Sequence, residues 1–139
     1  MGMVEMFSSE LIGQRARVET GAKIVSIDWW VMASEEISKI CEKEVMHADE
    51  GETSMMLACR PDLVNMEKAV KDETYDELAR KVTGGKPKNM PQVYLPFQAW
   101  TKTGLIGDAT KATREKGERI LEAVVSNIIQ FLSQVDQLL

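Results

Sequence analysis

The sequence predicts an α/β fold class, but only a part of such a fold. Four or five segments have helical patterns, one segment is a clear strand, and one more is a short candidate strand. An alternation of helix, strand and helix implies a parallel sheet, and one or two strands do not make one. A lone strand would also leave costly unpaired backbone groups on both edges. We therefore expect another chain or a missing N-terminal half to complete the sheet; the alternative is a mainly helical domain with a small sheet.

The first expected elements are a helix and a strand. Apolar residues recur at roughly helical spacing over residues 3–18, which predicts a helix with Gly21 as its C-cap. Residues 22–30 come directly after this terminator and form a short, β-branched run. We interpret them as a buried strand of a parallel sheet.

Two helices are expected in the middle of the chain. Ser34 is the predicted N-cap of a helix that runs to about Lys43, with acidic residues in its first turn. The next helix begins at Asp49 or Gly51, and Pro61 prevents its regular continuation.

The C-terminal part contains two more predicted helices. Thr74 opens one of them with a capping-box pattern. Residues 84–91 form a loop rich in glycine and proline, and residues 93–95 are the candidate short strand. The last helix is expected to start near Thr110, because one face collects apolar residues. That face contains Ile120, Val124, Ile128, Phe131, Leu132 and Val135.

Composition narrows the class of protein. The chain has 139 residues, 44% of them hydrophobic and 28% charged, and we treat residues 1–139 as a single partial domain. The net charge of −5 argues against a general binder of nucleic acid or anionic membranes. No secretory leader is visible. Cys41 and Cys59 are too few for a disulfide scaffold and fit a reducing compartment. We therefore expect a cytoplasmic location.

The segment around His47 is the most promising for chemistry. His47 is the only histidine of the chain, and three carboxylates follow within five residues. Histidine titrates near neutral pH and suits proton transfer, and a nearby carboxylate can fix its tautomer. Plainer interpretations remain open: a surface or structural histidine, and a capping box formed by Asp49 and Glu52. One histidine with carboxylates is not a metal-ligand signature.

The order of several motifs resembles the creatininase (creatinine amidohydrolase) family. The segment His47-Ala48-x-x-x-Glu52-Thr53-Ser54-x-Met56-Leu57-Ala58, followed by Pro61-Asp62-Leu63-Val64, is similar to one family motif. Downstream, Gly104-Leu105-Ile106-Gly107-Asp108-Ala109-Thr110 and Glu115-Lys116-Gly117 resemble the family segment that precedes its final helix. Upstream, Glu19-Thr20-Gly21-Ala22 and Trp29-Trp30 are similar to a strand start and a tryptophan-bearing strand end.

The resemblance implies a three-layer α/β/α sandwich with a mostly parallel sheet. It also implies a pair of divalent metals (Zn, Mn or Fe) that activates water for hydrolysis of a cyclic or linear amide, or of a related carbonyl ring. His47 matches a proton carrier, and Glu52 would orient it or hold the small-molecule substrate. Trp29 and Trp30 would wall the pocket, with core packing as the alternative. Asp108 would bind substrate, although a turn with an N-cap for the last helix is the simpler interpretation.

The chain departs from the family in its metal ligands. The family takes them from a Glu-x-His segment, a later Asp and an Asn-Gly-His loop, and none of these is present. We therefore predict that an N-terminal-half polypeptide of the same enzyme holds the metals, and that its strands pair with residues 22–30. A hetero- or homo-oligomer is expected. The alternatives are a non-catalytic interaction or scaffold subunit descended from the family, and a truncated fragment.

Overall fold

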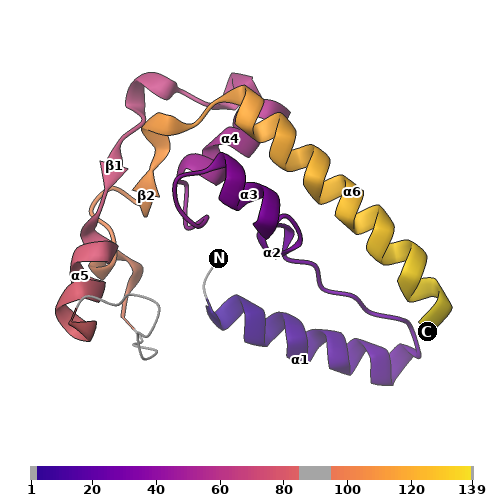
Figure 1. Cartoon of the computed structure of the whole chain (residues 1–139). Helices are drawn as coiled ribbons and strands as arrows, with labels where there is room; N and C mark the ends of the chain where they lie inside the picture. The colour runs from indigo at the N-terminus through magenta and orange to yellow at the C-terminus, as the bar shows by residue number, and fades with distance from the viewer. Residues whose placement is uncertain (1–2, 85–94, 139) are drawn as a thin grey trace.

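The computed structural model describes residues 3–84 and 95–138 (Figure 1). Within them the chain is mostly helical. The α-helices are α1 (Met3–Thr20), α2 (Trp29–Met32), α3 (Ser34–Ile40), α4 (Glu50–Cys59), α5 (Thr74–Thr83) and α6 (Arg114–Leu138). Short 3-10 turns are η1 (Pro61–Leu63), η2 (Met66–Lys68), η4 (Phe97–Ala99) and η5 (Ala109–Lys111). No helix of this described part is long and apolar enough to cross a bilayer.

The core lies where α2, α3 and α4 pack against the long helix α6 (Figure 1). Its buried members are Ala33, Ile37, Cys41, Ile120 and Val124. Gly117 makes the crossing of α4 and α6 possible, because a Cβ at this position would lie 1.9 Å from the backbone oxygen of Ser54. The Ser54 hydroxyl also accepts a hydrogen bond of 3.1 Å from the backbone N–H of Thr113. The two helices therefore meet nearly backbone to backbone.

The strands form a small antiparallel sheet. Strand β1 (Lys71–Asp72) pairs with β2 (Gly107–Asp108) in the register Lys71 to Asp108 and Asp72 to Gly107. His47 and Ile106 form an isolated antiparallel bridge nearby. The mostly parallel sheet that the sequence led us to expect is not found in residues 3–84 and 95–138. A parallel sheet needs neighbouring strands joined by crossovers, and these residues do not provide them.

The prediction of a strand at residues 22–30 is wrong. Residues 21–28 are irregular, and Trp29 already belongs to α2. Ile24 and Val25 are 45% and 40% exposed, so the run is not buried as we expected. A strand forms only where a neighbouring backbone accepts and donates its hydrogen bonds, and the described residues offer no such neighbour here. Figure 1 shows this stretch as an open trace that links α1 to the core.

The helices themselves are confirmed, with differences at their ends. Gly21 ends α1 with a φ of 68° and donates its N–H to the Arg17 oxygen, as predicted. Ser34 is not an N-cap, because the chain passes from α2 into α3 through Ala33. The helix at Thr74 forms, but Glu73 occupies the N-cap position without a side-chain hydrogen bond. The pattern therefore predicts the helix and misplaces its cap.

The last helix starts later than expected. Residues 109–111 form the turn η5, and α6 begins at Arg114. The expected loop and short strand over residues 84–95 lie outside the described residues, apart from Gly84 and Leu95. Gly84 is left-handed with a φ of 67° and caps α5.

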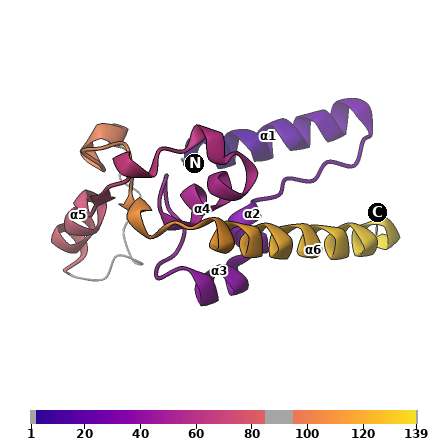
Figure 2. The same ribbon diagram turned by 90° about the horizontal axis from the view of Figure 1, so that it is seen from above.

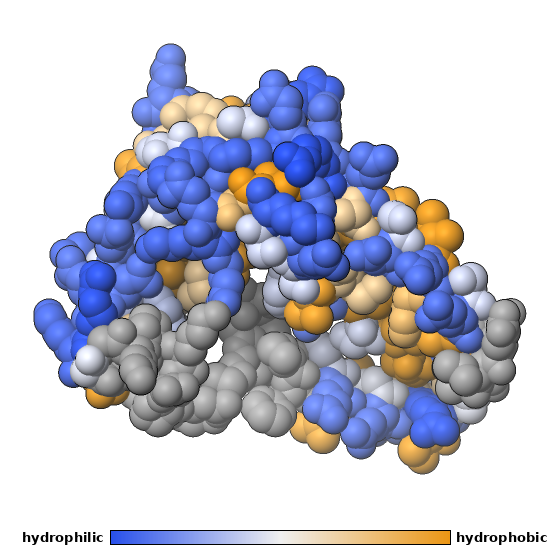
Figure 3. Space-filling model, viewed as in Figure 1, coloured by the Kyte–Doolittle hydropathy of each residue, from blue (hydrophilic) through white to orange (hydrophobic). Residues whose placement is uncertain are grey.

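Helix α1 lies apart from this core. In the view from above, α1 runs to one side of α6 and joins the core through residues 21–28 (Figure 2). Leu11, Ile12 and Val18 on α1 are 68%, 67% and 85% exposed. Hydrophobic surface also covers the far part of α6 (Figure 3), where Ile129 is 62% exposed. These apolar side chains lack cover within the described part of the chain.

Candidate functional site

His47 stands in a short loop directly before α4. Its backbone oxygen accepts a hydrogen bond of 2.8 Å from the N–H of Ile106. Its half-buried ring meets the ring of Phe97 edge to face, with centroids 5.0 Å apart and planes at 84°. The backbone and the ring of His47 thus both contact segments that are distant in sequence.

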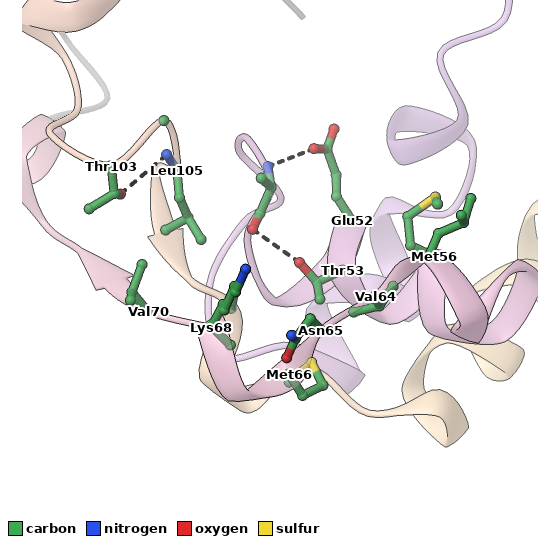
Figure 4. A pocket seen from close by; sticks show the side chains of 15 residues that line it. Glu52, Thr53, Met56, Val64, Asn65, Met66, Lys68, Val70, Thr103 and Leu105 are labelled. Carbon is green, nitrogen blue, oxygen red and sulfur yellow. Dashed lines mark hydrogen bonds between the residues drawn. The ribbon is translucent and has the colours of Figure 1, made fainter.

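The residue after His47 adopts a backbone conformation that is rare outside glycine. Ala48 has a φ of 51°, which costs free energy in a residue with a Cβ. The first turn of α4 supports it, because the Glu52 carboxylate accepts the Ala48 N–H at 2.7 Å and the Thr53 hydroxyl donates to the Ala48 oxygen at 3.1 Å (Figure 4). Both backbone polar groups of Ala48 are therefore hydrogen-bonded to side chains of α4.

Asp49 is the N-cap of α4, as its position in the sequence allows. Its carboxylate accepts hydrogen bonds from the backbone N–H groups of Gly51, Glu52 and Met46 at 3.0, 3.2 and 2.7 Å. Glu52 does not complete a capping box, because it binds Ala48 rather than the N–H of the N-cap. Burial raises the pKa of the Asp49 carboxyl, while its backbone donors act in the opposite direction. Asp49 therefore has a structural task at this loop.

A pocket of about 430 Å³ opens beside this loop. Ala48 and α4 form one side, the turn around η2 forms the floor, and residues 103–105 form the opposite wall (Figure 4). Its polar lining comes from Glu52, Thr53, Asn65, Lys68 and Thr103. The pocket thus presents one carboxylate and one ammonium group among amide, hydroxyl and apolar side chains. Such a lining suits a small polar ligand.

The other predicted site residues lie elsewhere. Trp29 and Trp30 pack against the core, with ring centroids 5.9 Å apart. Trp30 lines a separate cavity of about 590 Å³ beside α3. Asp108 accepts hydrogen bonds from the N–H and hydroxyl of Thr110, and so caps η5 rather than α6. Of the five predicted site residues, Glu52 lines the 430 Å³ pocket, and His47 stands directly before the lining residue Ala48 without lining the pocket itself. Trp29, Trp30 and Asp108 also lie outside it, and the roles of all five residues remain predictions.

The carboxylates of the described residues do not form a metal-binding set. No group of three histidine, cysteine, aspartate or glutamate side chains converges within residues 3–84 and 95–138. Glu50 and Glu42, which lie near the site, pair with Lys116 and Lys111. A pair of divalent ions needs several oxygen or nitrogen ligands around each metal. These residues do not fit such a pair, and we assign no reaction step to a metal on them.

Asp72 is a buried carboxylate next to the pocket wall that the sequence did not reveal. It is 6% exposed at the end of β1. Hydrogen bonds, led by those from Thr74, hold the pKa of its carboxyl well below the usual range. One carboxylate oxygen accepts hydrogen bonds from residues 101–103, and the other accepts one from Thr74. The bond to the Thr74 N–H, two residues on, is an Asx turn, and the Asp72-x-Thr74 spacing is the one signal that the sequence carried.

Comparison with known proteins places the chain in one family. The family model described as "Creatininase: Creatinine amidohydrolase" matches residues 3–132. No curated protein matches the chain.

Several solved structures are similar to it, among them three of creatininases. "Creatininase Mn" has 24% identity and a TM-score of 0.62, over 88% of this chain and 48% of its own. A tryptophan-to-phenylalanine mutant of type II creatininase has 26% identity and a TM-score of 0.54 over 86% of this chain and 47% of its own. A glutamate-to-glutamine mutant of creatininase complexed with creatine has 27% identity and a TM-score of 0.56 over 86% of this chain and 47% of its own. The chain spans about half the length of these proteins.

Proposed function

This chain belongs to the creatininase family, and we propose that it is a subunit or fragment of a metal-dependent hydrolase of that family. The substrate class is a cyclic or linear amide, or a related carbonyl ring. Creatinine is the first compound to test, because the matching family is described as creatinine amidohydrolase and one similar structure is complexed with creatine. In this proposal the chain contributes a proton-transfer histidine and part of the pocket wall.

His47 is the proposed proton carrier. Cleavage of an amide leaves a nitrogen that must gain a proton, and a histidine titrates in the range where it can both hold and release one. The observation that carries the proposal is the construction of the His47–Ala48 loop. It is held from one side by Ile106 and from the other by Glu52 and Thr53, and its Ala48 lines the 430 Å³ pocket. A strained peptide unit held this firmly is typical of functional sites.

Glu52 acts as a positioning residue in this proposal. One carboxylate oxygen holds the Ala48 N–H, and the same side chain lines the pocket, where it can accept an N–H from the substrate. Trp29, Trp30 and Asp108 are proposed to contact substrate from the neighbouring cavities that Trp30 and Asp108 line.

The metals and the missing sheet strands are assigned to a partner. When bound, a pair of divalent ions (Mn, Zn or Fe) would activate the attacking water, and its ligands would come mainly from an N-terminal-half polypeptide. Two observations support such a partner: the exposed Ile24 and Val25 on an unpaired extended segment, and the apolar side chains exposed on α1. Extended backbone without a neighbour is a template for strand addition. A cytoplasmic location remains part of the proposal.

The first experiment tests assembly. The chain is purified from its source and analysed by native mass spectrometry with metal analysis. A second polypeptide with about two divalent metals per pair is the expected result, in line with two-metal hydrolases. A monodisperse, metal-free species of this chain alone would contradict the proposal and favour a non-catalytic interaction or scaffold subunit.

The second experiment tests His47 in the assembled protein. His47→Gln keeps a similar size and hydrogen-bonding capacity but removes proton transfer near neutral pH. We expect creatinine hydrolysis to fall by about 100-fold or more, with assembly and metal content unchanged. Glu118→Gln, which removes a charge from an exposed ion pair on α6, is the control and should retain activity. Full activity of His47→Gln would rule out the proposed role.

A further inference from the structure

Asp72 gathers an unusual number of hydrogen bonds for one buried carboxylate. One oxygen accepts the Thr74 N–H at 2.9 Å. The other lies 2.8 Å from the Thr101 hydroxyl, 2.8 Å from the Lys102 nitrogen and 3.0 Å from the Thr103 nitrogen, and the Thr103 hydroxyl adds a contact of 2.9 Å. Charge-assisted hydrogen bonds of this kind are about twice as strong as neutral ones. A single side chain therefore fixes the turn at residues 101–104 from about thirty residues away.

The turn that Asp72 holds is one wall of the pocket. Thr103, Gly104 and Leu105 line the cavity opposite Glu52 and Thr53, and Figure 4 shows Thr103 and Leu105 on this wall. Gly104 has a φ of 87° and donates its N–H to the Thr101 hydroxyl at 3.0 Å. The shape of this wall thus depends on a network whose one charged member is Asp72. Asp72 itself does not line the pocket.

The same network reaches the backbone of His47. The wall continues through Leu105 into Ile106, whose N–H donates to the His47 oxygen. The next residue, Gly107, pairs with Asp72 across the small sheet. Asp72 thus anchors both ends of residues 101–107, and the segment between them carries the contact to His47.

From this geometry we propose that Asp72 is a positioning residue for the pocket: it holds residues 103–105 as the wall and, through Ile106, sets the place of His47. The inference rests on the proposed function for its catalytic consequence, but its structural consequence stands apart from that function. Sites work when a second layer of hydrogen bonds fixes the groups that touch the ligand.

The test uses the single histidine as a reporter, because its imidazole gives a resolved NMR signal in the full chain. Asp72→Asn removes the negative charge and replaces one acceptor oxygen by an NH2 group, so one of the two sets of donors loses its acceptor and the other loses a charged one. We expect hydrogen exchange of the Lys102 and Thr103 amides to rise at least about tenfold and the His47 signal to shift or broaden. Asp62→Asn, the same change at an exposed aspartate paired with Arg60, is the matched control and should alter neither.

A second pair of variants covers the case in which Asp72→Asn does not fold. Thr101 is 4% exposed and does not line the pocket. Thr101→Ser keeps the hydroxyl that faces Asp72, whereas Thr101→Val removes it at nearly constant volume. Thr101→Val tests the network as a whole, because the same hydroxyl also contacts the Gly104 N–H and the Leu105 oxygen. We expect it to reproduce the exchange and His47 effects, and Thr101→Ser to resemble the parent.

Activity measurements distinguish a failure of this inference from a failure of the proposed function. In the assembled protein we expect the KM for creatinine to rise about tenfold or more in Thr101→Val, and to be rescued in Thr101→Ser. An unchanged His47 signal and unchanged exchange at residues 102–103 in the folded variants would overturn the positioning role. Absence of amide hydrolysis by the parent protein, with His47 still responding to Thr101→Val, would overturn the proposed function and leave the positioning role standing.

Discussion

The crossing of α4 and α6 and the region of α1 with residues 21–28 are built on opposite principles. At the crossing, Gly117 lets two backbones touch, and Ile120 is fully buried. Around α1, Leu11 and Ile12 are two-thirds exposed, and the segment after Gly21 has no strand neighbour among the described residues. Apolar burial is the main stabilising term of folding. The crossing is therefore stabilised by its own packing, whereas the α1 region leaves apolar side chains exposed in the described part of the chain.

The largest difference in stability between the two regions is expected when one carbon atom is added at the crossing of α4 and α6. Gly117→Ala would place a Cβ 1.9 Å from the Ser54 oxygen, so the two helices must separate. We expect the free energy of unfolding to fall by about 3 kcal/mol or more, measured by urea denaturation. Gly13→Ala on α1 is the matched change: its Cβ meets only the exposed Ile24 side chain at 3.3 Å. Alanine favours helix, so this variant should be neutral or slightly more stable.

Truncation of the same residue type in the two regions comes next in expected effect. Ile120→Ala leaves a cavity in the core and should cost about 2–4 kcal/mol. Ile12→Ala removes an exposed side chain and should change the stability of the isolated chain by less than about 0.5 kcal/mol. Thermal or urea unfolding of both variants gives the comparison. If Ile12→Ala weakens binding of a partner polypeptide while the isolated chain is unaffected, α1 is a docking surface; equal destabilisation by both variants would erase the contrast.

A third prediction concerns acid. The pKa of the folded Asp72 carboxyl lies below its unfolded value, so its contribution to stability is complete above the unfolded value and declines as pH falls toward the folded one. Asp72→Asn should therefore be less stable than the parent by about 1–3 kcal/mol at pH 7, and this difference should shrink below about pH 4. Urea titrations from pH 7 to 2 measure it. A difference that stays constant down to pH 2 would show that the charge is not the stabilising feature.

The last prediction requires no substitution, because it uses the reactivity of the two cysteine thiols. Cys41 is buried in the core, and this burial, followed by the nearby carboxylates of Glu50 and Asp49, raises its pKa to about 11. Cys59 is exposed on the last turn of α4. Because the thiolate is the reactive form, a thiol reagent at pH 8 should modify Cys59 quickly and Cys41 only upon unfolding. Mass spectrometry of the products over time reads out both sites. Rapid modification of both thiols would mean that the core opens more readily than its packing suggests.

At the candidate site, the sequence predicted that the His47 loop lies next to the start of α4, but it did not predict the hydrogen bonds between them. Glu52 lies at the loop that contains His47, where its carboxylate contacts the residue after the histidine. The carboxylate binds the Ala48 N–H, because a positive φ turns that peptide toward the helix. Periodicity carries no information on such a conformation. Asp72 was missed for a related reason: its partners at residues 101–103 are distant in sequence, and an aspartate that will be buried looks like any other charged residue.

Local chemistry in the sequence determined most helices, their terminators at Gly21 and Pro61, the cap at Asp49 and the membership of the family. These features depend on neighbours within about four residues along the chain. Only the tertiary structure decided that residues 22–28 stay unpaired, that His47, Trp30 and Asp108 lie outside the pocket that Glu52 lines, and that Asp72 supports its wall. Strand pairing, burial and pocket geometry depend on which distant segment lies opposite, and that is settled by packing rather than by local pattern.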